Sequence, residues 1–218
     1  MRLKYLFARA VGTLIAFGAP ASVAYAANLV TNGDFSAGNT GFISDYTYNP
    51  ANYGNNGDYF VQSDYNGFKD HTTGTGNFLI GDGATDAGSR VWAETVSTVA
   101  GADYTFSYYH SEFNGGPNAY LAFFLDGVKV GASVAPTDRT WNQFSYTFNS
   151  GAATSHNLAI VDETLGYAYN DFGLDDIALD GAAPGGVPEP STWALMLVGF
   201  GGIGLSMRHR PKARGAIA

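Results

Sequence analysis

Apolar and polar side chains alternate with a period of two in several segments of residues 28–180. Within residues 143–148, aromatic positions alternate with polar ones, which predicts a half-buried strand. The dipeptide Asp126-Gly127 separates two further apolar runs and predicts a tight hairpin between them. This stretch keeps no sustained helical period, so the pattern favours an all-β fold.

About ten short strands can be placed in this way between residues 27 and 180, and their spacing is typical of an antiparallel β-sandwich. The predicted strands lie at residues 28–35, 59–62, 78–81, 91–99, 104–108, 121–125, 128–130, 143–148, 157–161 and 172–179. We therefore expect one sandwich domain over residues 27–180.

Residues 36–77 interrupt this regularity, because glycine, asparagine, aspartate, tyrosine and threonine dominate there. A loop region of this length is typical of functional segments. Aromatic rings with polar tips suit contact with sugar rings. The candidate ligand-binding residues are Tyr46, Tyr48, Tyr53 and Trp92. The alternative for each tyrosine is packing of the loop onto the sandwich, and Trp141 is expected in the core because it opens a strand.

Residues 1–26 have the three parts of a secretory signal peptide. Basic residues at the start are followed by an apolar run at residues 10–19 and by the small residues of Ala24-Tyr25-Ala26. We expect an N-terminal signal helix that signal peptidase removes during export.

A second three-part pattern lies at the C-terminus. Val187, Pro188, Glu189 and Pro190 are followed by an uncharged apolar stretch at residues 192–207 and by a cluster of basic residues. The prolines keep the junction extended. The apolar stretch predicts a short transmembrane helix whose basic end stays in the cytoplasm.

This pattern resembles the PEP-CTERM sorting signal of exported bacterial proteins over residues 187–210, and we place the signal segment at residues 188–212. The resemblance implies recognition and cleavage by an exosortase of a Gram-negative bacterium that makes exopolysaccharide. A precursor anchored in the inner membrane would then become a protein of the cell surface or extracellular matrix. Residues 181–187, rich in glycine and alanine, predict a flexible linker before the signal. The alternative is a plain single-span anchor.

The body of the chain has a resemblance of its own. Several of its segments are similar, in order, to galactose-binding-like domains of the carbohydrate-binding-module type. These segments are residues 28–42, 91–96, 100–106, 141–148 and 174–179. The resemblance implies a jelly-roll sandwich that is non-catalytic, binds sugar and holds one structural Ca²⁺ between its first and last strands.

Charge narrows the range of partners. Without residues 1–26 and 188–218, the chain keeps four basic and eighteen acidic residues, a net charge of −14. Such a body repels phosphates, which excludes nucleic-acid binding. It also opposes acidic polymers, so the expected partner is a neutral extracellular polysaccharide, or an acidic one bridged by cations.

Acidic residues near the first and last predicted strands are the candidates for a metal site. A strict period of two places Asp175 on the core face with Ile177 and Leu179, where a carboxylate needs hydrogen bonds or a cation. Asp34 and Asp175 are the candidate ligands for the Ca²⁺ that the resemblance implies. The related domains often have an acidic residue where this chain has Ser36, which departs from their pattern. The alternative is that Asp175 accepts backbone N–H bonds.

We expect that the protein is not an enzyme and requires no cofactor. The sequence contains no nucleophile elbow, zinc-binding helix motif or phosphate loop. Three hypotheses remain. The first is a non-catalytic glycan-binding protein of the surface or matrix, the second is a structural matrix protein of the same fold without a specific ligand, and the third is a polysaccharide hydrolase.

The C-terminal tail is expected to be removed in the native cell, because the three-part pattern is a processing signal. Intact mass spectrometry of protein extracted from the cell surface should show the loss of everything after about residue 190. Recovery of the full-length membrane form alone would contradict this expectation.

Overall fold

The computed structural model describes residues 27–51, 54–113, 119–136, 138–165, 170–184 and 196–201. The predicted signal helix, the motif at residues 187–190 and most of the predicted membrane helix at 192–207 lie outside these residues. Residues 196–201 are helical, and none of the described helical residues belongs to a segment with the length and hydrophobicity of a membrane span. Residues 26–186 form one compact unit that holds every described strand and both hydrophobic clusters. We therefore expect this body to fold on its own.

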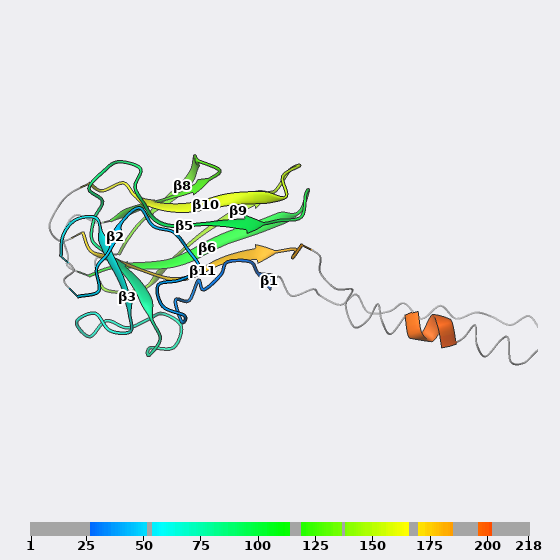
Figure 1. The fold of residues 1–218 in the computed structure, drawn as a ribbon, viewed down its shortest axis with the longest axis horizontal. Coiled ribbons are helices and arrows are strands. Elements are labelled where there is room, and N and C mark those ends of the chain that lie inside the picture. The colour runs from blue at the N-terminus through cyan, green and yellow to red at the C-terminus, as the bar shows by residue number, and fades with distance from the viewer. Residues whose placement is uncertain are drawn as a thin grey trace, which may run out of the picture. The chain divides into compact units, whose positions relative to one another are not determined.

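Two β-sheets make up the body, one above the other in Figure 1. The strands of the larger sheet are β1 (Ala27–Asn28), β2 (Thr47–Tyr48), β3 (Asp58–Gln62), β4 (Phe78–Gly81), β6 (Asp103–Glu112), β9 (Asn142–Asn149) and β11 (Phe172–Gly181). Those of the smaller sheet are β5 (Arg90–Ser97), β7 (Tyr120–Leu125), β8 (Val128–Val134) and β10 (Ser155–Asp162).

The larger sheet has the order β2-β3-β4-β11-β6-β9, with β1 paired to β11, and the smaller sheet has the order β5-β10-β7-β8. All these pairs are antiparallel except β2 with β3. The predicted all-β sandwich is confirmed, with eleven described strands in place of about ten.

One hydrophobic core joins the two sheets. Its largest side chains include Trp92 of β5, Phe106 of β6 and Phe123 of β7, all of them fully buried. The rings of Phe106 and Phe123 stack across the sandwich with their centroids 4.0 Å apart. Because these rings come from different sheets, their packing holds the layers together.

Two local predictions are confirmed by the strands and turns. In β9 the aromatic positions are buried or half-buried, and the polar positions between them are exposed. Asp126 and Gly127 connect β7 to β8, and their φ angles are 51° and 78°. Positive φ at both central positions is typical of a type I′ hairpin turn, which an Asp-Gly pair favours.

A second hydrophobic cluster lies on the outer face of the larger sheet. Phe78 and Ile80 of β4 point away from the core and belong to this outer cluster. The loop at residues 63–77 covers them with Phe68. Trp141, which was predicted in the core, is only half-buried and packs against the outer cluster instead.

A bulge in β11 reverses the side-chain alternation of that strand. Its register with β6 shifts between Asp175 and Ala178, and Asp176 has a φ of 46°. Leu174 and Ile177 both point into the core although they are three positions apart. Asp175 therefore lies on the outer side, and the prediction that it shares the core face with Ile177 is wrong. One extra residue in a strand moves every later side chain to the opposite face.

The first residues of the body pack directly against this bulge. The N–H of Ile177 donates to the carbonyl oxygen of Gly33 at 2.9 Å, and a Cβ at Gly33 would fall on the carbonyl oxygen of Ile177. The side-chain oxygen of Asn28 accepts the N–H of Val30 at 2.9 Å and that of Leu179 at 3.0 Å. Hydrogen bonds thus join the beginning of the body to its last strand.

Replacement of Gly33 by alanine should lower the free energy of unfolding by about 2 kcal/mol or more, because the added Cβ has no space beside the backbone of β11. The matched control is Ser36→Ala, an exposed change three residues away that should cost about 0.5 kcal/mol or less. Urea denaturation of residues 27–184 measures both. Equal stability of the two variants would show that the first segment does not pack on β11 in this way.

Candidate ligand-binding site

Apolar side chains cover the outer face of the smaller sheet as well as its inner face. Leu158 and Ile160 of β10 point into the core, which places Ala159 and Val161 on the outer face. Phe124 of β7 lies opposite Ala159 in the register of the two strands. A solvated sheet face is usually polar, so this apolar strip is a candidate contact surface.

Two adjoining cavities follow the strip and form one groove. Their volumes are about 300 and 210 Å³, and they share Gly88, Phe124 and Val161. Other lining residues are Ala87, Arg90, Gly127, Asn157, Ala159, Glu163 and Leu165. The groove therefore has an apolar floor with one aromatic ring and polar groups on its rim.

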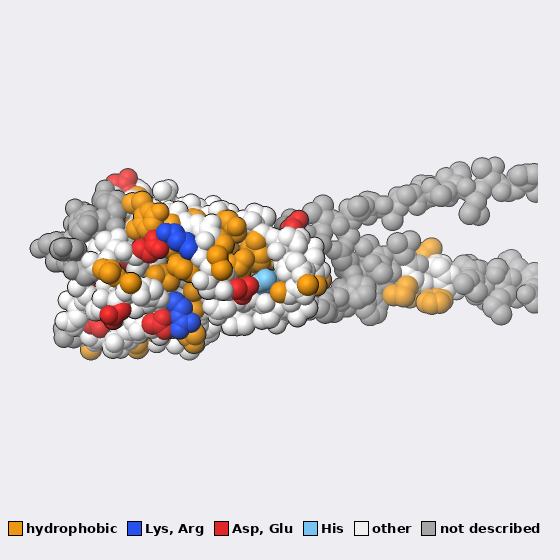
Figure 2. Space-filling view, turned by 90° about the horizontal axis from the view of Figure 1, so that it is seen from above, with side chains coloured by type: hydrophobic (Ala, Val, Ile, Leu, Met, Phe, Trp, Pro, Cys, Tyr) orange, Lys and Arg blue, Asp and Glu red, His pale blue; other side chains and the backbone are white. Residues whose placement is uncertain are grey.

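Two ion pairs lie at the groove. Arg90 binds Asp45 through two hydrogen bonds, from Nε at 2.8 Å and from Nη2 at 2.6 Å, and these bonds hold the pKa of Asp45 below its usual value. Lys129 donates to Glu163 at 2.6 Å. Figure 2 views the body from the side of the smaller sheet, and hydrophobic side chains lie between two places where blue and red side chains meet.

The two ion pairs beside the groove are neutral, whereas the body as a whole is strongly acidic. Only four basic residues lie between residues 27 and 187, and two of them, Arg90 and Lys129, form these ion pairs. Each of these cations is matched by one carboxylate, so the two pairs add no net charge at the groove.

Two of the sequence-predicted ligand residues are buried. Trp92 is fully buried in the core, because the alternation of β5 turns its side chain inward, so the prediction that it contacts ligand from an exposed position is wrong. Tyr46 is 6% exposed, and its hydroxyl is buried without a hydrogen-bond partner. Burial, with the nearby charges of Asp162 and Asp82, raises the pKa of Tyr46. Tyr46 therefore packs the loop onto the body, which is the alternative weighed for it.

Tyr48 and Tyr53 have different outcomes. Tyr48 is 42% exposed on β2, and its ring packs on Tyr59 with centroids 5.3 Å apart. Tyr53 lies outside the described residues. Tyr48 does not line the groove, so the described part of the chain does not bring the predicted ligand residues together.

Phe124 was missed from the sequence, although a signal for it exists. Residues 121–125 are apolar at every position, so β7 offers hydrophobic side chains to both faces of its sheet. An alternation that points Phe123 inward must point Phe124 outward. A strand that is apolar on both faces is therefore a sequence signal for a candidate binding surface on its outer face.

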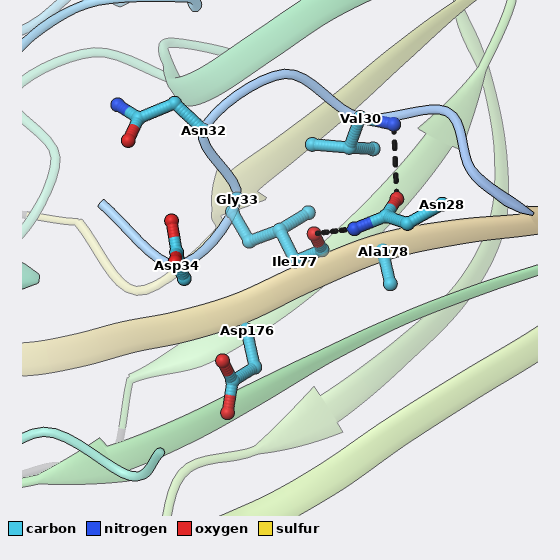
Figure 3. Close-up of a pocket in the computed structure, with 8 residues that line it drawn as sticks. All are labelled: Asn28, Val30, Asn32, Gly33, Asp34, Asp176, Ile177 and Ala178. Atoms are coloured by element: carbon cyan, nitrogen blue, oxygen red, sulfur yellow. Dashed lines mark hydrogen bonds between the residues drawn. The ribbon is translucent and has the colours of Figure 1, made fainter. Parts of the chain in front are cut away.

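The candidate metal ligands do not converge. Asp34 lines a cavity of about 340 Å³ between the first segment and β11, and Asp175 does not line it. Figure 3 shows the carboxylates of Asp34 and Asp176 on opposite sides of β11. One oxygen of Asp34 already accepts the N–H and hydroxyl of Ser36.

Asp175 uses both of its carboxylate oxygens for backbone donors. Oδ2 accepts the N–H of His71 at 2.7 Å, and Oδ1 accepts the N–H of Asp176 at 2.8 Å. Across the part of the chain that the structure describes, no three His, Cys, Asp or Glu side chains are grouped to hold a metal ion. Asp34 and Asp175 are therefore not brought together as ligands of one ion, and the structural Ca²⁺ between the first and last strands stays a prediction.

The C-terminal pattern finds its counterpart among known protein families. Residues 186–210 match the family described as the PEP-CTERM protein-sorting motif. The tail is a PEP-CTERM sorting signal. The signal implies processing by an exosortase and marks an exported protein that is sorted to the cell surface. Sequence comparison with curated proteins finds no match.

Solved structures resemble the body that precedes this PEP-CTERM signal. The tandem CBM22-1-CBM22-2 domain of Xyn10C from Paenibacillus barcinonensis has a TM-score of 0.50 and 17% identity, covering 78% of this chain and 50% of that one. TmCBM61 in complex with β-1,4-galactotriose has a TM-score of 0.47 and 13% identity, covering 70% and 97%. The Stig cyclase Fisc from Fischerella sp. TAU has a TM-score of 0.48 and 11% identity, covering 73% and 98%.

These likenesses concern the fold. The chain spans half the length of the tandem module structure. Carbohydrate-binding modules and enzymatic domains both occur among the similar structures. The body that precedes the PEP-CTERM signal is a two-sheet sandwich that resembles the tandem CBM22 domain in fold.

Several buried carboxyl groups make the stability of this sandwich depend on pH. Burial raises the pKa of Asp175 to about 7 and that of Asp162 to about 6. Burial and the neighbouring Asp171 raise the pKa of Asp82 to about 7. An unfolded aspartate ionises near pH 4, so the folded body binds more protons than the unfolded chain between about pH 4 and pH 7.

The free energy of unfolding should therefore fall by about 1 kcal/mol or more as the pH rises from 5 to 8. Urea denaturation of residues 27–184 at both pH values measures the change. Asp175→Asn should lose less stability than the wild type between pH 5 and pH 8, because the amide does not titrate and one of the groups with a raised pKa is removed. A body equally stable at the two pH values would contradict the raised pKa values.

Proposed function

We propose that the chain is an exosortase-processed protein of the cell surface or extracellular matrix, whose jelly-roll sandwich binds a neutral polysaccharide in the groove of the smaller sheet without cleaving it. The observation that carries the proposal is the apolar floor around Phe124 between two ion pairs. Support also comes from the PEP-CTERM signal and from the fold likeness to the tandem CBM22 domain.

The floor of the groove suits the apolar face of a sugar ring. Phe124 is half-buried, so part of its ring stays open to a ligand, whereas Ala159 and Val161 beside it line the groove but are only 3% exposed. The C–H groups of a pyranose pack on an aromatic ring much as another apolar group would. Two linked cavities fit successive residues of a polymer better than an isolated monosaccharide.

The rim supplies hydrogen-bonding groups for sugar hydroxyls. The Asn157 amide, the Arg90–Asp45 pair and the Lys129–Glu163 pair stand beside the floor. The side chains of both pairs remain about one-third or more exposed, between 32% and 41%. Exposed ion pairs of this kind add little to folding stability, so a role in recognition explains their placement better.

The groove favours binding over cleavage. Glu163 is the single carboxylate among its described lining residues, and it is paired with Lys129. Hydrolysis of a glycosidic bond commonly uses two carboxyl groups on either side of the bond. Because each aromatic contact contributes only about 1–3 kcal/mol, we expect weak affinity that changes little with salt.

Phe124→Ala should weaken retention of the body on a neutral polysaccharide by about tenfold, since the stacking surface is lost. Affinity electrophoresis of residues 27–184 in gels that contain single neutral polysaccharides measures this retention. The melting temperature should change little, because Phe124 lies outside the core.

The matched control is Tyr48→Ala, which removes an exposed aromatic ring from the other sheet and should leave retention unchanged. If Tyr48→Ala weakens retention and Phe124→Ala does not, the ligand binds at the loop region. If no polysaccharide retains the body, the structural matrix protein is the better interpretation. Release of reducing sugar would favour the hydrolase.

A further inference from the structure

The two sheets have four edges, and three of them are protected against pairing with another chain. At one edge of the larger sheet, β2 has only two residues, with Pro50 soon after it. In the smaller sheet, β5 is covered by Ile43, which exchanges two backbone hydrogen bonds of 2.9 Å with Ala93. The other edge, β8, carries Lys129 and a register shift against β7. Short strands, proline, covering segments, bulges and lysine are the usual means of protecting an edge.

β9 forms the fourth edge and has none of these features. It is eight residues long and pairs with β6 over its whole length without a register shift. It contains no proline, glycine or charged residue, and residues 140–161 contain no Asp, Glu, Lys or Arg. Within the described residues, no strand pairs with the outer side of β9.

The side chains of β9 also leave apolar surface uncovered. Phe144 and Tyr146 point toward the core, where both rings pack on Phe123 with centroids 6.2 and 6.0 Å away. They nevertheless remain half-buried, because the sheet ends at β9. One further strand beside β9 would cover them and satisfy the free backbone groups of this edge.

We propose that β9 pairs antiparallel with β9 of a second copy of this chain, so that the two larger sheets form one continuous sheet. The occupant is a second copy because β9 is complementary to itself, with its aromatic positions in one row and its polar positions in the other. Two bodies with a net charge of −14 repel each other, and β9 is the long uncharged strip along which they can approach.

The sequence of β9 allows this pairing in a two-fold symmetric way. Facing residues of an antiparallel pair must lie on the same side of the sheet. A two-fold axis through Ser145 or through Tyr146 meets this requirement, since it places the aromatic residues of one copy opposite those of the other. Such an interface is isologous and closes at two copies, and the two-residue β2 at the opposite edge does not extend it.

Sedimentation velocity of residues 27–184 tests the proposal at concentrations up to about 100 μM. The wild-type body should sediment as a dimer, and Ser145→Lys should halve the mass, because lysines on an edge strand oppose strand pairing. Ser97→Lys, the same change at an exposed position of β5, should stay dimeric. Phe124→Ala should also stay dimeric, which separates strand pairing from association through the apolar groove.

If Ser145→Lys lowers the melting temperature, Gln143→Lys on the same exposed row replaces it in the comparison. A wild-type body that remains monomeric at the highest concentration would overturn the proposal. So would a dimer that persists in the β9 variants, or one that dissociates equally with Ser97→Lys. The outcome is independent of whether the groove binds a polysaccharide.

Discussion

The left-handed backbone at Asp176 is the constraint on which the larger sheet depends. This conformation costs a non-glycine residue on the order of 1 kcal/mol, and aspartate tolerates it better than most. The extra residue lets Ile177 return to the core while Asp175 turns outward to accept the N–H of His71. The Asp176 carboxylate lies 2.7 Å from the His71 ring. One irregularity thus positions the core, the first segment of the body and the loop at residues 63–77.

Features that depend on residues close together in the chain could be predicted from the sequence. Features that depend on contacts with the other sheet or with a distant loop could not. The alternation of β9 and the Asp126-Gly127 turn are local, so both appear in the structure as predicted. A bulge is invisible to a strict period of two, which is why the face of Asp175 was mistaken. Trp92 and Phe124 both occupy strands with apolar residues on both faces, and only the position of the second sheet decides which ring is exposed.

The surfaces of the body differ in how much charge they carry. Eighteen carboxyl groups against four cations keep most of the surface hydrated and apart from other acidic molecules. Two regions depart from this background. The ion pairs at the groove are neutral because each cation is matched by a carboxylate, whereas β9 has no charge at all. The pairs leave charged hydrogen-bonding groups at the surface, and β9 leaves uncharged amide, hydroxyl and backbone groups.

The position of β11 inside the larger sheet affects how the body responds to a force on its C-terminal tail. This ten-residue strand lies inside the larger sheet, bonded to β4 on one side and β6 on the other, and its last residue, Gly181, leads toward the sorting tail. A force on the tail reaches the sandwich through the end of β11. Hydrogen bonds on both sides of this strand resist that force together, whereas a strand at the sheet edge has bonds on one side only. The last strand of the body is therefore its mechanically most strongly held connection to the tail.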